Sequence, residues 1–203
     1  MRKICIGLHV YEQPERLFAS IRSLRANTNS RAEVVLLPDG PDAATRNALS
    51  TLTDFAQLPT SEVRGAAACF NRLAAYSNAG VVVLLESGAQ VGPRWLEHLV
   101  RALDADSRNG LAGPSTNISW NEQCVFPRAG ASEADVARTV REAEAKFGDE
   151  LRGLEPLHSL AEFCYAVRRQ VIECIGAADD TRTHHDDIRS RVERFVRCVA
   201  PTS

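Results

Sequence analysis

The stretch VVVLLESG, at residues 81–88, constrains the fold more than any other part of the sequence. Its five aliphatic residues show no polar alternation, and such a strand is buried on both faces, as in a parallel sheet covered by helices. Glu86 stands where the strand ends, and Gly88 follows two residues later. The stretch therefore predicts a central strand whose carboxyl end opens onto a polar site.

Strand-like and helix-like segments alternate along the first half of the chain. The expected strands cover 3–10, 33–37 and 81–85, and the expected helices cover 14–27, the segment after Asp42, 67–78 and 93–103. Two of the helices begin with a proline, and all carry apolar residues at helical spacing. The repeated order predicts an α/β fold with a doubly wound, Rossmann-like, mostly parallel sheet and helices on both faces.

The second half of the chain is less regular. A short apolar piece at 111–114 precedes a polar stretch, and a helix is expected over 132–148 with Ser132 as its cap and Gly148 as its stop. Later elements are a strand at 162–167, helices at 168–176 and 186–195 and a strand at 195–200. Because no linker rich in Gly, Ser or Pro divides the chain, we expect a single domain over residues 1–203.

Charge and cysteine content narrow the function classes. With 24 basic and 26 acidic residues the net charge is -2, so no global field attracts nucleic acid. The six cysteines form no C-x-x-C pair, which favours buried free thiols over a zinc or redox motif. The sequence shows no leader pattern and no stretch of about 20 apolar residues that predicts a membrane span, so a cytoplasmic location is expected.

Polar residues that follow the predicted strands are the candidate site residues. Ligands of open α/β sheets bind outside the carboxyl ends of the strands. The candidates are His9, Tyr11 and Glu12 after the first strand, Asp39 and Asp42 after the second, and Glu86 with Gly88 after the third. The Asp39-Gly40-Pro41-Asp42 segment also has turn chemistry, so a role in a turn and a helix cap is an equal alternative.

The order of these motifs resembles that of family 2 glycosyltransferases. The matching features are Tyr-x-x-Pro-Glu at 11–15, Asp-Gly-x-Asp at 39–42, the glycine-led helix with Asn71, Glu86 followed by Pro-x-Trp-Leu, GLAGPSTN at 110–117 with Gln123, and FCYAVRRQVIECIGAADD at 163–180. No single motif is specific, but their order is. The similarity covers about residues 3–191.

The resemblance implies a transferase of GT-A fold that uses a nucleotide-diphosphate-sugar. Residues 1–114 would bind the donor and residues 115–203 the acceptor. An acid after the second strand, here Asp39, would contact the base or ribose. The donor-binding candidates are Tyr11, Glu12, Asp39, Arg64, Asn71, Glu86 and Gly88.

The family's Asp-x-Asp motif, which holds a divalent metal and the diphosphate, falls on residues 86–88. The first acid is Glu86, but Gly88 stands in place of the second. Magnesium can bind through one carboxylate and the substrate's phosphates, so Glu86 is the expected ligand of Mg²⁺ or Mn²⁺. Because guanidinium groups bind phosphate bidentately, arginines are the candidates to supplement or replace the metal: Arg64, Arg72, Arg94, Arg168 and Arg169.

The catalytic base is expected in THHDDIRSR at 183–191, which occupies the place of the family's Glu-Asp-x-Asp segment. Alignment on Arg191 places a histidine at the base position, and a shift of one residue places Asp186 there. His185, Asp186 and Asp187 are therefore the candidate catalytic residues, since either chemistry can accept the acceptor's proton. The alternative is that Asp186 and Asp187 only cap a helix.

The polar stretch after residue 114 is the candidate acceptor wall. Asn117, Trp120 and Gln123 can offer amides and an indole face to a sugar, and a surface loop pinned by Trp120 is the alternative. The sequence thus predicts an inverting glycosyltransferase. The rival interpretation is a non-catalytic nucleotide- or sugar-binding domain, because the second metal ligand is missing. The chain ends after its last predicted strand, which is compatible with a domain of a longer protein.

Overall fold

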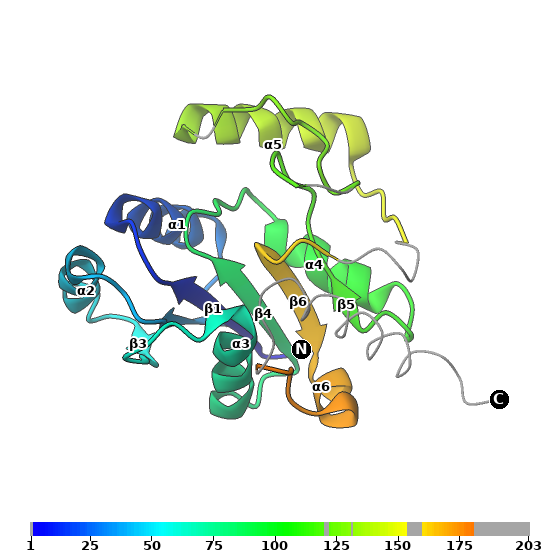
Figure 1. Cartoon of the computed structure of the whole chain (residues 1–203). Coiled ribbons are helices and arrows are strands. Elements are labelled where there is room, and N and C mark those ends of the chain that lie inside the picture. Colours follow the sequence, from blue (N-terminus) through cyan, green and yellow to red (C-terminus); the bar gives the residue numbers. More distant parts are fainter. Residues whose placement is uncertain (1, 120–121, 131, 154–159, 181–203) are drawn as a thin grey trace.

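The computed structural model describes residues 2–119, 122–130, 132–153 and 160–180, and these form one sheet with helices on both faces (Figure 1). The strands are β1 (Ile4–Val10), β2 (Ala32–Pro38), β3 (Ala56–Gln57), β4 (Val81–Glu86), β5 (Leu111–Ala112) and β6 (Cys164–Arg168). The helices are α1 (Pro14–Asn27), α2 (Ala43–Ser50), α3 (Gly65–Tyr76), α4 (Trp95–Asp104), α5 (Glu133–Phe147) and α6 (Arg169–Ile175).

The strand order is β3-β2-β1-β4-β6-β5. The strands β1 to β4 run parallel, whereas β6 is antiparallel to both β4 and β5. From β1 the chain winds outward through β2 to β3, and it then returns to place β4 on the other side of β1. The winding direction therefore reverses between β1 and β4, where open α/β sheets bind their ligands.

The central position of β4 is confirmed, and its five aliphatic residues are buried on both faces. Val81, Val83 and Leu85 pack in one core with α1, α2 and α4. Val82 and Leu84 pack in the other core with α3 and α6. Each such fully buried side chain contributes about 1.5–3 kcal/mol from apolar burial, which explains why the unbroken aliphatic run dictates a central strand.

Most helix ends follow the sequence prediction. Asp42 caps α2 by accepting the Thr45 N–H at 2.7 Å, and Ser132 caps α5. Helix α4 is an exception, because it begins at Trp95 and not at Pro93. Arg94 adopts a left-handed backbone with φ of 59°, which an α-helix cannot include.

Other segments differ from the prediction in length. Helix α2 ends at Ser50, and Leu52 reaches the same core from the turn that follows. Helix α5 lies outside the sheet layers and contains no buried residue (Figure 1).

In the part of the chain that the structure describes, no helix is long and apolar enough to cross a membrane. The helix expected at 186–195 and the strand at 195–200 lie outside that part.

Candidate functional site

The carboxyl ends of β1, β2 and β4 meet at one edge of the sheet. His9 of β1 is in register with Glu86 of β4, and the next residues along β1 and β2, Val10 and Pro38, are paired. Tyr11 and Asp39 directly follow these two strands. The fold thus brings together four residues predicted from strand ends at the point where the winding reverses.

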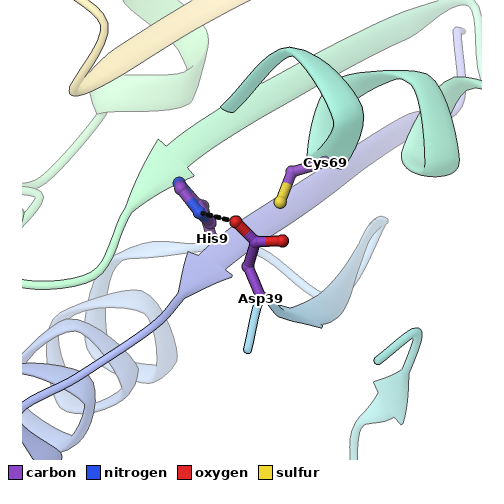
Figure 2. Close-up of side chains that lie close together, drawn as sticks. All are labelled: His9, Asp39 and Cys69. Atoms are coloured by element: carbon purple, nitrogen blue, oxygen red, sulfur yellow. Dashed lines mark hydrogen bonds and ion pairs between the residues drawn. The ribbon is translucent and has the colours of Figure 1, made fainter. Parts of the chain in front are cut away.

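Asp39 is fully buried, and both oxygens of its carboxylate accept hydrogen bonds. His9 Nε2 lies 3.2 Å from Oδ2 (Figure 2), Thr60 Oγ1 donates to Oδ1 at 3.0 Å, and the backbone N–H groups of Arg64 and Gly65 donate at 3.0 and 2.8 Å. Burial alone would raise the pKa of Asp39, but the bonds from His9 and these backbone groups outweigh it and lower the pKa to about 2. The carboxylate is therefore ionised and satisfies the first N–H groups of α3.

The burial of Asp39 does not allow the expected direct contact between its carboxylate and a nucleotide in this conformation. The carboxylate has no exposed surface, so in this conformation it organises the site and does not line it. Arg64, whose backbone it binds, has an exposed side chain at the rim. His9 retains only 8% of its surface exposed.

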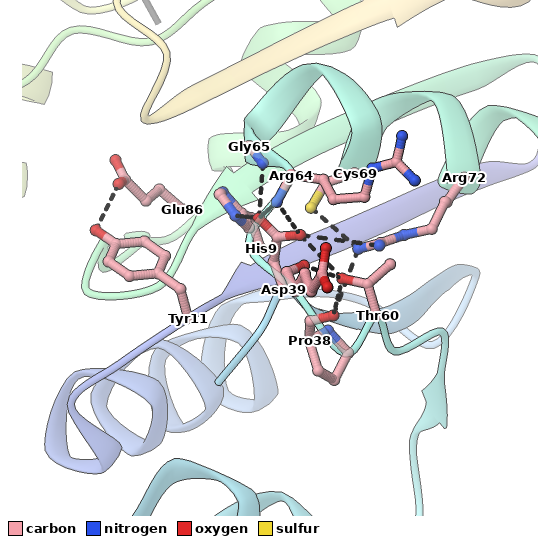
Figure 3. Close-up of polar contacts among 11 residues, drawn as sticks. His9, Tyr11, Pro38, Asp39, Thr60, Arg64, Gly65, Cys69, Arg72 and Glu86 are labelled. Carbon is pink, nitrogen blue, oxygen red and sulfur yellow. Dashed lines mark hydrogen bonds and ion pairs between the residues drawn. The ribbon is translucent and has the colours of Figure 1, made fainter. Parts of the chain in front are cut away.

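Tyr11 and Glu86 form the second polar contact of the site (Figure 3). The Tyr11 hydroxyl donates to Glu86 Oε1 at 2.9 Å, and the Tyr11 ring lies 5.3 Å from the His9 ring. Burial and the charge of Glu86 raise the pKa of Tyr11 to about 12, which keeps the phenol a hydrogen-bond donor. Oε2 of Glu86 makes no hydrogen bond to the described residues, so one carboxylate oxygen is available to a ligand.

Gly88 is the third residue of a tight turn after β4. The Ala89 N–H donates to the Glu86 carbonyl at 3.0 Å, and Gly88 has φ of 102°, which favours glycine at this turn position. The N–H of Gly88 donates to Ser20 Oγ at 2.8 Å and is thus committed to α1. Glu86 is therefore the carboxylate that residues 86–88 present.

A metal ion could be held by Glu86 or by a buried cluster. Within the described residues, one group of three or more His, Cys, Asp or Glu brings its ligand atoms together, and it comprises His9, Asp39 and Cys69 within 4.8 Å of one another. Asp39 is already saturated by donors, and Cys69 Sγ accepts from Arg72 Nη2 at 3.2 Å. Burial raises the pKa of Cys69 to about 12, so this thiol stays protonated. Glu86 fits a divalent cation better, because such a cation can bind through one carboxylate and the phosphates of a substrate.

A protein-family model described as glycosyl transferase family 2 matches residues 5–176 of this sequence. The chain belongs to glycosyltransferase family 2. A search of curated protein sequences finds no match.

Among solved structures, this family 2 domain is similar to the mannosyltransferase PcManGT from Pyrobaculum calidifontis in complex with GDP-Man and Mn²⁺, with a TM-score of 0.62. The two sequences are 16% identical over 94% of this chain, which spans half the length of the mannosyltransferase chain. The likeness confirms the predicted GT-A-type α/β fold.

Two other donor-binding candidates of the family 2 domain, Asn71 and Glu12, differ in their surroundings. Asn71 Oδ1 accepts the Ala178 N–H at 2.8 Å, and Nδ2 donates to the Ala178 carbonyl at 2.9 Å. These bonds hold the segment after α6 against α3. Glu12 is exposed, and its charge acts on Tyr11.

Arg168 and Arg169 lie at the opposite end of β4 from Glu86. Arg168 pairs with Val81, the first residue of β4, which lies about 16 Å along the strand from Glu86. The Arg168 guanidinium donates to the carbonyl of Leu103 at the end of α4 and to that of Asn109 in the loop that follows. These arginines therefore lie away from the candidate donor site.

Two other candidate arginines are also engaged. Arg94 forms ion pairs with Glu144 at 3.1 Å and Asp149 at 3.5 Å. Arg72 is tucked against Cys69 and Pro38 (Figure 3). Of the five arginines predicted from the sequence, Arg64 is the one at the carboxyl edge that is exposed and whose side chain forms no hydrogen bond or ion pair with a described residue.

The acceptor candidates form a loop network. Gln123 is buried, where Nε2 donates to the Pro114 carbonyl at 2.8 Å and Oε1 accepts the Ala161 N–H at 2.6 Å. Asn117 Nδ2 donates to the Ala129 carbonyl at 3.1 Å. Trp120 and the catalytic candidates His185, Asp186 and Asp187 lie outside the described residues.

Sequence reasoning missed two residues of the site. Thr60 reaches Asp39 because a single β-bridge pairs the two residues. Arg16, in the first turn of α1, lies beside Gly88. Its only sequence signal is its position two residues after the helix-starting Pro14.

Proposed function

We propose that this family 2 domain transfers a sugar from a nucleotide-diphosphate-sugar to an acceptor, with inversion at the anomeric carbon. The observation that carries the proposal is the convergence of His9, Tyr11, Asp39 and Glu86 at the reversal point between β1 and β4. The solved structure of a similar mannosyltransferase with GDP-Man and Mn²⁺ supports a donor of this class.

The nucleotide would lie along the carboxyl edge of β1 and β2. The Tyr11 ring, fixed by its contact with His9 and its bond to Glu86, offers a flat aromatic face to the base. Asp39 holds the start of α3, which places exposed Arg64 at the rim for polar groups of the donor.

Glu86 would hold the divalent cation, Mg²⁺ or Mn²⁺. When bound, such an ion neutralises charge that develops on the leaving nucleoside diphosphate. The protein's own contribution is one carboxylate whose Oε1 is fixed by Tyr11 and whose Oε2 is available. The buried strand and the Ser87–Gly88 turn keep that carboxylate at the edge of the sheet.

Inversion requires a base on the face of the sugar opposite the leaving group, and we assign it to the segment containing His185, Asp186 and Asp187. The acceptor would bind near the loop that carries Asn117 and Trp120, with buried Gln123 holding the shape of that loop. Because the chain spans half of the similar mannosyltransferase, further domains of a longer protein are part of this proposal.

A second candidate function is a binding domain without transfer activity. Gly88 favours it, since the turn at this position leaves Glu86 as the carboxylate of the motif. Such a domain would still bind a nucleotide diphosphate at the same edge but would release no product.

Calorimetric titration with nucleoside diphosphates and their sugars, in EDTA and in Mn²⁺, tests both functions. The transferase proposal expects binding and enzymatic release of the nucleoside diphosphate, whereas binding without release supports the second candidate. Glu86→Ala should weaken binding in Mn²⁺, and Glu97→Ala on α4 is the matched control because its carboxylate contacts only the exposed Asn29 amide among the described residues. Absence of binding under every condition would overturn both.

A further inference from the structure

Arg16 lies against the position of the missing second acid. A Cβ on Gly88 would lie 3.2 Å from Cδ of Arg16 and 3.6 Å from its Cβ and Cγ. The space beside Gly88 that a side chain would enter is therefore taken by the aliphatic stem of this arginine. The family motif has a carboxylate at this place, and the present chain has a guanidinium alongside it.

The charge of Arg16 has no protein partner in the described part of the chain. Its side chain is exposed, and no hydrogen bond or ion pair joins its guanidinium to a described residue. It also lies in the first turn of α1, where the helix dipole disfavours a cation. An anionic ligand would interact favourably with both this unpaired cation and the positive end of the helix.

The charge of Arg16 also acts on a residue of the candidate donor site. Burial and Glu86 raise the pKa of Tyr11 to about 12, and the charge of Arg16 acts on the same phenol in the opposite direction. Its field therefore reaches the Tyr11 hydroxyl that binds Glu86 Oε1. Arg16 and the available oxygen of Glu86 thus belong to the same edge of the site.

We propose that Arg16 binds the diphosphate of the nucleotide-sugar donor directly, beside the position where the second acid is missing. The inference rests on the proposed function. The guanidinium can donate two parallel hydrogen bonds to phosphate oxygens, which a metal ligand at position 88 would not provide.

The remaining arginines compete poorly for this role. Arg94 is held by two acids, and Arg168 and Arg169 bind carbonyls at the far end of β4. Arg64 is exposed, but its backbone is bonded to Asp39 beyond β2, on the other side of β1 from Glu86.

The test compares Arg16→Gln with the wild-type domain in titrations with a nucleoside and its diphosphate, each in EDTA and in Mn²⁺. We expect the ratio of diphosphate affinity to nucleoside affinity to fall about 10- to 100-fold, as for loss of hydrogen bonds to a charged group. Arg16→Lys should recover part of the ratio. Arg22→Gln is the matched control, because Arg22 lies on the same helix and pairs with Glu133 of α5.

The outcomes separate this inference from the proposed function. Suppose that the wild-type domain binds the diphosphate and that Arg16→Gln has the same ratio of diphosphate to nucleoside affinity. This result overturns the role of Arg16 and leaves the proposed function standing. An equal loss of nucleoside and diphosphate affinity also overturns it, because Arg16 would then not act on the phosphates. If the wild-type domain binds neither compound, both proposals fail.

Discussion

The Tyr11 hydroxyl donates to Oε1 of Glu86 at 2.9 Å across the reversal point between β1 and β4. The bond fixes one oxygen of the carboxylate and leaves the other available. Hydrogen bonds from a second layer of residues orient metal-binding carboxylates and influence metal affinity. The orientation of this carboxylate matters more when the protein supplies only one, because no second carboxylate holds the ion in place.

Tyr11→Phe should therefore weaken the effect of the metal on nucleotide binding. The substitution keeps the ring beside His9 and removes the bond to Glu86. We expect the gain in diphosphate affinity that Mn²⁺ produces to shrink by about tenfold. Titrations with and without Mn²⁺ measure this gain, and Tyr76→Phe is the control because Tyr76 donates to Glu33 at 2.8 Å on the surface. An unchanged gain would show that Tyr11 does not orient Glu86.

Asp39 should be a main determinant of stability. Asp39→Ala removes the buried carboxylate that accepts hydrogen bonds from the Thr60 hydroxyl and from the backbone N–H groups of Arg64 and Gly65. We expect a loss of about 3–5 kcal/mol in the free energy of unfolding, because each buried donor left without its acceptor costs about 1–3 kcal/mol. Asp42→Ala, which removes only the cap of α2, should cost about 1 kcal/mol. Urea denaturation checks both values, and equal losses for the two variants would contradict the network.

The same carboxylate should make stability depend on acid. Its pKa in the folded domain is about 2 and lies below the ordinary value of 3.8, so its contribution is present above pH 4 and is lost as the pH falls toward 2. The difference corresponds to about 2 kcal/mol. Asp39→Asn cannot titrate, so its unfolding free energy should fall less steeply between pH 4 and pH 2 than that of the wild type. Parallel curves in urea denaturation across this range would exclude Asp39 as the source.

The sequence predicted the central elements because their signals are local. The aliphatic run of β4 can be read without knowledge of any neighbour, and so can the helical spacing of α1. The strands β3 and β5 have two residues each, too few to produce a periodicity. The late start of α4 depends on the left-handed backbone of Arg94, which no residue type signals there.

The site was predictable only as far as strand ends determine it. The rule on carboxyl ends found His9, Tyr11, Asp39 and Glu86, which the structure brings together. The rule could not show which side chains form hydrogen bonds to backbone groups that are distant in the sequence. Asn71 bonds to Ala178, 107 positions away, and such partners have no signature in either local sequence.

Arg169 gives a last prediction, because its residue type and its motif suggest phosphate binding whereas its geometry indicates a structural role. Its guanidinium donates to the carbonyls of Ala74 at 2.9 Å and Ala79 at 3.2 Å, and also to that of Ser77. These groups lie at and just after the end of α3, where a cation offsets the negative end of the helix dipole.

Arg169→Ala should lower the free energy of unfolding by about 2–3 kcal/mol, the cost of losing hydrogen bonds from a charged group to partly buried carbonyls. Its diphosphate affinity should equal that of the wild type, since the guanidinium lies at the opposite end of β4 from Glu86. Arg25→Ala, which breaks the exposed pair with Asp54, should cost less than about 1 kcal/mol. Denaturation and titration of the same preparations distinguish a structural role from phosphate binding. An Arg169→Ala variant of unchanged stability with weakened diphosphate binding would show that Arg169 binds the donor and has no structural role.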